Sequence, residues 1–317
     1  MYRRDFLAST AAATAALAAG PAFATPRHEG TGDAAPRPPV GVFTKSFQDW
    51  PIPKVCQAFA ELGLDGLDLT VRPSGHIEPE NAAAKLPGAV AAAEAAGVQI
   101  LQLTTGVTDA GPDADRLFGA AAENGVPRLK LGYFRQGGAP LNQRMDEVRK
   151  TLAQIARLAE KHGVTPCLHV HSGDYLPSHG TMLYALLKDL PPERIGAYVD
   201  TLHMHVEGGD AGWRQGLELL APWIKLCAVK NYRQEPAGRG DLGMAQWKKT
   251  VVPVADGFSP IPAFVKELNE RGFAGPFSLH SEYQGGHSFE DLNTAETLEQ
   301  TRQDWAFFQS VLGEVYS

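Results

Sequence analysis

Short apolar runs that end in polar or charged side chains alternate along the chain with longer segments of helical period. Four such runs, at 167–171, 197–200, 227–230 and 277–282, end in His, Asp, Lys or Glu. They follow one another at intervals of about 30 to 50 residues, with helix-like segments between them. This rhythm is typical of parallel strands that are joined by crossover helices.

The same pattern extends over most of the chain. Strands are expected at 40–44, 66–71, 98–104, 128–131, 167–171, 197–200, 227–230 and 277–282. Helices are expected at 52–61, 80–96, 113–123, 142–162, 182–188, 213–220, 261–271 and 296–312. Glycines lie just past four of the helices, as C-caps require: Gly97, Gly125, Gly163 and Gly272.

Eight βα units with no sign of an antiparallel pair predict an α/β protein with a single closed (β/α)8 barrel. An open doubly wound sheet is disfavoured, because no G-x-G-x-x-G motif follows the first strand. The barrel is expected to span 39–317, which fits one barrel of about 250 residues with modest loop insertions.

The first 24 residues have the features of an export signal. Arg3 and Arg4 precede an Ala-rich apolar stretch that ends in the small-residue sequence Ala-Phe-Ala. We expect a twin-arginine-type signal peptide over 1–24, which would export the folded protein to the periplasm or outside the cell. A single-pass anchor is the alternative, but the stretch is short and contains Gly20 and Pro21.

Residues 25–38 are rich in Pro, Gly and charge and are expected to form a disordered linker. The formal charge of −7, with no basic block, argues against nucleic acid or an anionic membrane as a partner. A small carbohydrate substrate fits this charge balance better than nucleic acid or a membrane does. The sequence is also compatible with a homo-oligomer. Three scattered cysteines make no disulfide framework and are expected to be small buried hydrophobes: Cys56, Cys167 and Cys227.

The polar residues at the strand ends predict a site at the barrel mouth. Alternate residues of a strand share a face, so His169 and His171 point together, as do His280 and Glu282. With Asp200, these strand ends offer His169, Asp200, His280 and Glu282 as ligands for one ion. Imidazole and carboxylate ligands suit a divalent ion such as Mn, Fe, Co or Zn.

Lys230 allows two interpretations. In a partly buried site beside a metal its pKa would be lowered, which would let it donate or accept a proton near neutral pH. It could instead be a structural ion-pair partner of Asp200 or Glu282. Glu282 has the same ambiguity between metal ligand and general base. In the second βα loop, Arg72 and His76 are expected to contact the substrate.

Several segments resemble the sugar phosphate isomerase/epimerase superfamily, the xylose isomerase-like barrels that include ketose 3-epimerases, inosose dehydratases and endonuclease IV. The matching segments are 60–69 (AELGLDGLDL), 199–203 (VDTLH), 229–231 (VKN) and 252–261. The resemblance covers the whole predicted barrel and implies a (β/α)8 fold.

The resemblance also implies a divalent metal held by Glu, Asp, His and Glu at the ends of strands five to eight. In this sequence His169, Ala228 and His280 stand at three of those positions, and Asp200 is retained. The His-x-His of strand five is similar to that of inosose dehydratases. The position of His203 contacts substrate hydroxyls in the resembling family, and His171 is expected to bind substrate beside it.

The predicted function is that of a metal-dependent enzyme that removes the proton α to the carbonyl of a sugar, keto-sugar or keto-glycoside. The metal would stabilise the enediolate, and Glu282 or Lys230 would move the proton. Isomerisation, epimerisation and β-elimination share this step, and the loss of the symmetrical carboxylate pair favours a lyase or hydratase. The alternative is a catalytically silent exported sugar-binding barrel. Endonuclease activity is disfavoured by the acidic balance.

Overall fold

A computed structural model describes residues 37–317. The predicted signal peptide at 1–24 and nearly all of the predicted linker at 25–38 lie outside the described residues. Within the described range, no helix combines the length and the apolar character needed to cross a membrane.

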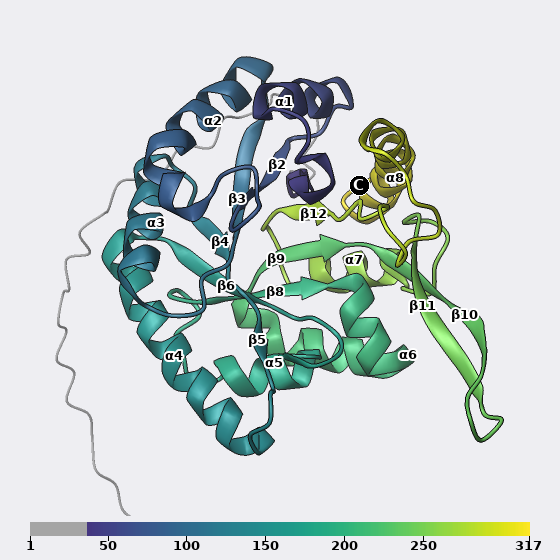
Figure 1. The fold of residues 1–317 in the computed structure, drawn as a ribbon. Helices are drawn as coiled ribbons and strands as arrows, with labels where there is room; N and C mark the ends of the chain where they lie inside the picture. Colours follow the sequence, from purple (N-terminus) through teal and green to yellow (C-terminus); the bar gives the residue numbers. More distant parts are fainter. Residues whose placement is uncertain (1–36) are drawn as a thin grey trace, which may run out of the picture. The chain divides into compact units, whose positions relative to one another are not determined.

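The described chain folds into a closed parallel barrel of eight strands surrounded by helices (Figure 1). The order around the barrel is β1, β12, β9, β8, β6, β4, β3 and β2, so neighbouring barrel strands follow one another in the sequence. The barrel strands are β1 (Val40–Phe43), β2 (Gly66–Val71), β3 (Gln99–Thr105), β4 (Arg128–Lys130), β6 (Thr165–His169), β8 (Gly196–Asp200), β9 (Ile224–Val229) and β12 (Phe277–Leu279). The predicted (β/α)8 barrel is therefore confirmed.

Seven of the eight helices that cover the barrel begin and end close to the predicted positions, whereas the sixth begins at Thr201 rather than at residue 213. They are α1 (Ile52–Glu61), α2 (Ala82–Ala96), α3 (Pro112–Glu123), α4 (Leu141–His162), α5 (Gly180–Leu187), α6 (Thr201–Leu220), α7 (Ile261–Glu270) and α8 (Thr294–Val315). Short 3-10 helices are η1 (Thr44–Phe47), η2 (Pro79–Asn81) and η3 (Ala221–Trp223).

Alternation along β2 shows how one strand serves two environments. Leu67 and Leu69 belong to the main apolar core, which also contains the buried residues of the helices. Asp68 lies between them and bonds to side chains of β3, β8 and β12 across the barrel interior. The period of two therefore directs apolar residues to the helix layer and polar residues to the centre of the barrel.

The long helix α4 buries one stripe of its surface. Val148, Leu152, Ile155 and Ala159 are three or four residues apart, the spacing that brings side chains to one face of a helix. The helix ends at Gly163, which has a φ of 68° in the left-handed region. The other predicted glycine caps also have positive φ: Gly97, Gly125 and Gly272.

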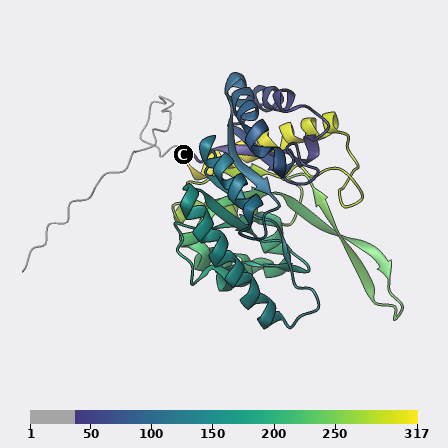
Figure 2. The same cartoon turned by 60° about the vertical axis from the view of Figure 1, so that its left-hand side comes forward.

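The prediction that the chain has no antiparallel pair is wrong. A hairpin of β10 (Asn231–Arg239) and β11 (Ala245–Val252) projects from the barrel, and β5 (Phe134–Arg135) pairs with β7 (Tyr175–Leu176) (Figure 2). The outer part of the hairpin is exposed on both faces, so its sequence lacks the alternation of a half-buried strand. Both pairs lie outside the barrel, which explains why the βα rhythm remains intact.

The prediction that the sixth helix begins at residue 213 is also wrong, because α6 begins at Thr201 and includes His205 and Glu207. These residues lie in the first half of α6, which begins directly after β8. The Asp200 side chain caps this helix, because it accepts hydrogen bonds from two backbone N–H groups of the first turn. A kink at Gly209, with φ 56° and ψ −156°, separates this half from the predicted helical stretch.

Candidate active site

A cavity of about 230 Å³ opens at the carboxyl ends of the barrel strands. It brings together many of the residues predicted from the strand ends and from the second βα loop. The lining residues are Phe43, Lys45, Arg72, Thr104, Lys130, Tyr133, His169, His171, Tyr175, Tyr198, Lys230, His280 and Glu282. The position matches that of the active sites of α/β barrels, which form at this end.

Lys230 follows β9 and lies between two carboxylates. Its Nζ is 3.2 Å from Glu282 Oε2 and 3.5 Å from Asp200 Oδ2, and the residue is buried. Burial alone would lower the pKa of Lys230, but the two carboxylates outweigh it and raise the pKa. The structure therefore places Lys230 in an ion pair with both carboxylates, while a lowered pKa beside a metal and the role of Lys230 in the reaction stay predictions. Lys230 is a fixed cation at neutral pH.

Asp200 is fully buried at the end of β8 and uses both of its oxygens. Oδ1 accepts the backbone N–H groups of Leu202 and His203 at 2.8 and 2.9 Å. Oδ2 lies 3.2 Å from His169 Nε2 and beside Lys230. Burial would raise the pKa of Asp200, but His203, Lys230 and His169 together hold it well below its usual range.

Glu282 follows β12 and is bound by two lysines. Lys45 Nζ lies 2.6 Å from Oε1, and Lys230 Nζ lies near Oε2. Burial would raise the pKa of Glu282, but the two ammonium groups hold it well below its usual range. A carboxylate with such a low pKa is a weak proton acceptor, so this geometry gives little support to Glu282 as general base.

The histidines of the site are neutral. Burial lowers the pKa of His169 to about 4 and that of His171 to about 3, and it holds those of His203 and His280 well below their usual range. His203 Nε2 and His280 Nδ1 are buried without a hydrogen-bond partner among the described residues. Buried polar atoms normally have partners, and His280 lines the cavity, so a substrate hydroxyl is a suitable group to meet its Nδ1.

Below the cavity, Asp68 organises a polar network inside the barrel. Thr104 Oγ1 and Gln102 Nε2 donate to its carboxylate at 2.7 Å each. The Tyr198 hydroxyl contacts Asp68 at 3.2 Å and His280 Nε2 at 2.9 Å. Burial raises the pKa of Asp68 to about 6, although the hydrogen bonds from these donors act to lower it. The network fixes the ring of His280 at the cavity wall. None of the sequence-based site predictions included Asp68 or Tyr198.

Lys130 is a second buried lysine in the cavity, and the sequence-based reasoning missed it. It ends β4, so the rule that selected the other strand ends applies to it equally. Its Nζ lies 3.4 Å from the centre of the Tyr133 ring, and no carboxylate of the described residues forms an ion pair with it. Burial and the nearby Arg72 charge lower its pKa to about 7.

The structure does not bring all predicted substrate contacts into the cavity. Arg72 and His171 line it, and His203 lies behind it, with Nε2 3.8 Å from Asp200 Oδ2. His76 points elsewhere, because its ring nitrogens contact Thr70 Oγ1 and the backbone oxygen of Phe47, each at 3.1 Å. The geometry therefore gives no support to His76 as a substrate ligand.

The four predicted metal ligands do not fit an ion as they are arranged. In residues 37–317, no three His, Cys, Asp or Glu side chains are placed as a metal-binding group. The Lys230 ammonium lies between the two carboxylates, and His280 Nε2 contacts the Tyr198 hydroxyl. The assignment of His169, Asp200, His280 and Glu282 as metal ligands stays a prediction.

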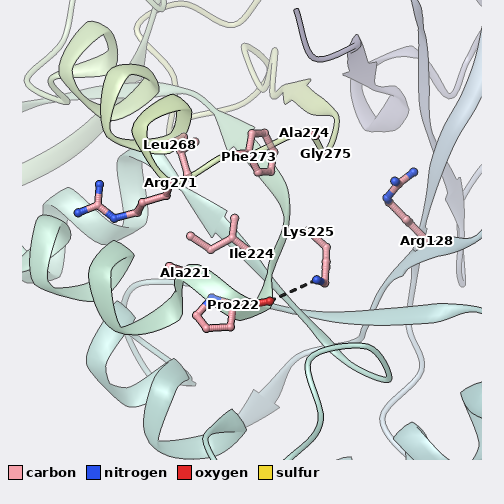
Figure 3. A pocket seen from close by; sticks show the side chains of 11 residues that line it. Arg128, Ala221, Pro222, Ile224, Lys225, Leu268, Arg271, Phe273, Ala274 and Gly275 are labelled. Atoms are coloured by element: carbon pink, nitrogen blue, oxygen red, sulfur yellow. Dashed lines mark hydrogen bonds between the residues drawn. The ribbon is translucent and has the colours of Figure 1, made fainter. Parts of the chain in front are cut away.

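A second cavity of about 310 Å³ lies at the opposite end of the barrel (Figure 3). Its lining includes Arg128 and Lys225, at or beside the amino ends of β4 and β9, and Gly275, which precedes β12. In α/β barrels, this end contributes to stability rather than catalysis. The mouth at the carboxyl ends is therefore the candidate active site.

A closed parallel barrel with titratable side chains gathered at its carboxyl ends belongs to the class of α/β barrels that bind small molecules at that face. A family model described as "Xylose isomerase-like TIM barrel" matches residues 56–310. The chain belongs to this family. Among curated proteins, no sequence matches it significantly.

Solved structures with the same fold include two sugar epimerases. D-psicose 3-epimerase with D-tagatose from Clostridium cellulolyticum H10 has 15% identity and a TM-score of 0.63, over 86% of this chain and 99% of that one. The 3-keto-D-glucoside 4-epimerase from E. coli has 13% identity and a TM-score of 0.63, over 86% and 100%.

A third similar structure contains a metal. It is a xylose isomerase-like TIM barrel protein from Mycobacterium smegmatis in complex with magnesium, with 16% identity and a TM-score of 0.63, over 88% of this chain and 98% of that one. At these identities the likeness establishes the fold alone.

The three cysteines are buried and free, as predicted: Cys56, Cys167 and Cys227.

Proposed function

We propose that the protein is an enzyme that removes the proton α to the carbonyl of a sugar, keto-sugar or keto-glycoside. The observation that carries the proposal is a pair of buried lysines in one cavity that have opposite character. Lys230 is ion-paired and stays charged, whereas Lys130 is unpaired and has a pKa of about 7. Enediolate formation needs one group of each kind, a cation for the oxygen and a base for the proton.

The two lysines divide the chemical step between them. The neutral amine of Lys130 would take the proton from the carbon next to the carbonyl. Negative charge would develop on the carbonyl oxygen, where the Lys230 ammonium can donate a hydrogen bond. Arg72 adds a further positive charge to the cavity wall, and neutral His280 offers its unpartnered Nδ1 to a substrate hydroxyl.

Elimination or isomerisation fits this site better than epimerisation. A single base can move the proton in either of the first two reactions, whereas epimerisation needs proton transfer at both faces of one carbon. The cavity offers Lys130 as an unpaired base, while Glu282 is held by two ammonium groups. A lyase or hydratase acting on a keto-sugar or keto-glycoside is therefore the form of the proposal that we favour.

Deuterium exchange tests the proposed step directly. The purified protein is incubated in D₂O with 3-keto-glycosides, ketoses and inososes, and NMR detects deuterium at the carbon next to the carbonyl. Exchange with at least one class supports the proposal. Tight binding of a sugar without exchange or turnover would favour the second candidate, a silent sugar-binding barrel, for which the unpartnered Nδ1 of His280 would serve as a hydroxyl contact.

The pH profile should reveal Lys130. We expect kcat/KM to increase as the pH rises through about 7, because Lys130 loses its proton there and becomes a base. In Lys130→Met this limb should disappear and kcat should fall by about 10²-fold or more. Lys225→Met is the matched control, since Lys225 lines the cavity at the other end of the barrel. An unchanged profile in Lys130→Met would assign the base to another residue.

We also propose that the protein is exported by a twin-arginine-type signal to the periplasm or outside the cell. The support is the N-terminal sequence, with Arg3 and Arg4 before an Ala-rich stretch. Cell fractionation of the full chain and of a variant with Arg3→Lys and Arg4→Lys tests the route. The variant should accumulate inside the cell, and equal export of both chains would contradict the proposal.

A further inference from the structure

We infer that the ammonium of Lys230 takes the place of the divalent ion that the family resemblance implies, so that the site works with a cation built into the chain. This inference rests on the proposed function for its chemistry. Its evidence is the geometry of the cavity, and its first tests need no substrate.

The ammonium of Lys230 lies between two carboxylates of the predicted metal site. Lys230 Nζ contacts a carboxylate from each neighbouring barrel strand, Asp200 after β8 and Glu282 after β12. These are two of the four side chains that the sequence offers to a metal. The ammonium therefore lies where an ion bound by these carboxylates would lie, and it already neutralises part of their charge. A divalent ion beside it would be repelled by a buried like charge.

The oxygens of both carboxylates already have partners in the protein. Asp200 Oδ1 caps α6 through the N–H groups of Leu202 and His203, and Oδ2 is shared by His169 and Lys230. Glu282 contacts a lysine with each oxygen. An ion would have to displace these donors, and the displaced Lys230 ammonium would remain buried without a partner.

Strand β9 lacks one of the metal ligands that the resemblance implies. Ala228 stands at the position on this strand where the resemblance implies a histidine ligand, and it is buried in a small cluster with Cys167, Tyr198 and Leu226. It offers no donor atom. Lys230 is the next residue on the same face, and its side chain is long enough to reach the carboxylates. The strand thus lacks the neutral ligand and supplies a cation.

The substitution leaves the catalytic role intact. An ammonium has three N–H donors. One donates to Glu282 Oε2 at 3.2 Å, and Asp200 Oδ2 lies 3.5 Å from Nζ as an ion-pair partner, which leaves a donor free. That donor is available to a carbonyl oxygen in the cavity, which Lys230 lines. The site would then stabilise an enediolate by a hydrogen-bonded cation rather than by metal coordination.

Ion binding by the wild-type protein is the first test. The protein is produced with added manganese and zinc, and its metal content is measured by mass spectrometry. Thermal melts are recorded in EDTA, Mn²⁺ and Zn²⁺. We expect well below one ion per chain and the same Tm in all three conditions, since an ion that binds the folded state would raise Tm. One tightly held ion per chain, with a fall in Tm in EDTA, would overturn the inference.

The second test measures whether an added cation can stabilise a variant that lacks the Lys230 ammonium. Lys230→Ala removes the ammonium and leaves Asp200 and Glu282 without it. We expect a lower Tm that millimolar ethylammonium or Mn²⁺ restores at least in part, because either cation can fill the vacated position. Lys45→Ala is the matched control, since it also removes a lysine from Glu282 but leaves the position between the carboxylates filled. A Tm of Lys230→Ala that neither cation raises would contradict the inference.

If Lys230→Ala does not fold, the metal content and the Tm of the wild-type protein alone decide whether the inference holds. Deuterium exchange then separates this inference from the proposed function. Exchange that continues in EDTA supports both. Exchange that stops in EDTA and returns with a divalent ion overturns the built-in cation while the proposed function stands. Absence of exchange with every carbohydrate contradicts the proposed function. In that case the metal content and the Tm of the wild-type protein still test the inference.

Discussion

Replacing Lys230 with Met is expected to lower kcat by about 10²-fold or more, with a much smaller change in KM. The reason is that the hydrogen bond from the ammonium to the carbonyl oxygen strengthens as negative charge develops there. An interaction that is stronger in the transition state than in the ground state acts mainly on kcat. Steady-state kinetics on the substrate that shows deuterium exchange measures the effect.

The control for this variant is Lys188→Met. Lys188 is exposed on the surface and contacts Asp189, so its loss should leave turnover unchanged. A Lys230→Met protein with normal turnover and a lower Tm would show that Lys230 is a structural ion-pair partner and has no part in the reaction.

Asp200→Ala should give the largest loss of stability among single substitutions at the site, about 3–5 kcal/mol. The change removes one of the two carboxylates of the buried Lys230 ammonium. It also removes the N-cap of α6, which contributes about 1 kcal/mol in other helices. Urea-induced unfolding of wild type and variant measures the difference.

Two further variants separate these contributions. Asp200→Asn keeps an oxygen for the helix cap and should be less destabilised than Asp200→Ala. Asp189→Ala removes an exposed partner of Lys188 and should change stability little. Equal losses in Asp200→Asn and Asp200→Ala would show that the charge, and not the cap, carries the effect. A loss in Asp200→Ala as small as that in Asp189→Ala would contradict the assigned role.

The pH dependence of stability follows from the same carboxylate. The pKa of Asp200 in the folded protein lies well below the value of about 3.9 expected in the unfolded chain. Its contribution is therefore complete above that value and is lost as the pH falls towards the folded pKa. In Asp200→Asn, the dependence of unfolding free energy on pH below about 4 should be weaker than in the wild type.

The barrel could be predicted from the sequence because its elements have strong periodicity. The stripe of α4 from Val148 to Ala159 and the buried strands bounded by turn residues are local signals. The hairpin of β10 and β11 could not be predicted in this way. Its outer half is exposed, its β10 strand contains Pro236, and its strands pair with each other rather than with the core.

The site could be predicted in composition but not in its contacts. Strand ends pointed to Lys230 and Glu282, and the same rule applied to β4 would have included Lys130. The pKa of Lys230 depends on how close its ammonium lies to two carboxylates, which are 30 and 52 residues away along the chain. Likewise, the sequence marks Asp68 only as part of a strand, because its hydrogen-bond partners come from three other strands. Such contacts are set by tertiary structure and leave no local pattern.

The hairpin of β10 and β11 also offers a place for protein engineering. Leu242, near its tip, is 90% exposed, whereas Lys249, close to its base, is anchored to Ser172 Oγ by a bond of 2.9 Å. Exposed loop tips are where inserted domains are best tolerated. A fluorescent domain or an affinity tag inserted between Gly240 and Gly243 would therefore stand clear of the barrel, while the bond from Lys249 to Ser172 keeps the base of the hairpin in place.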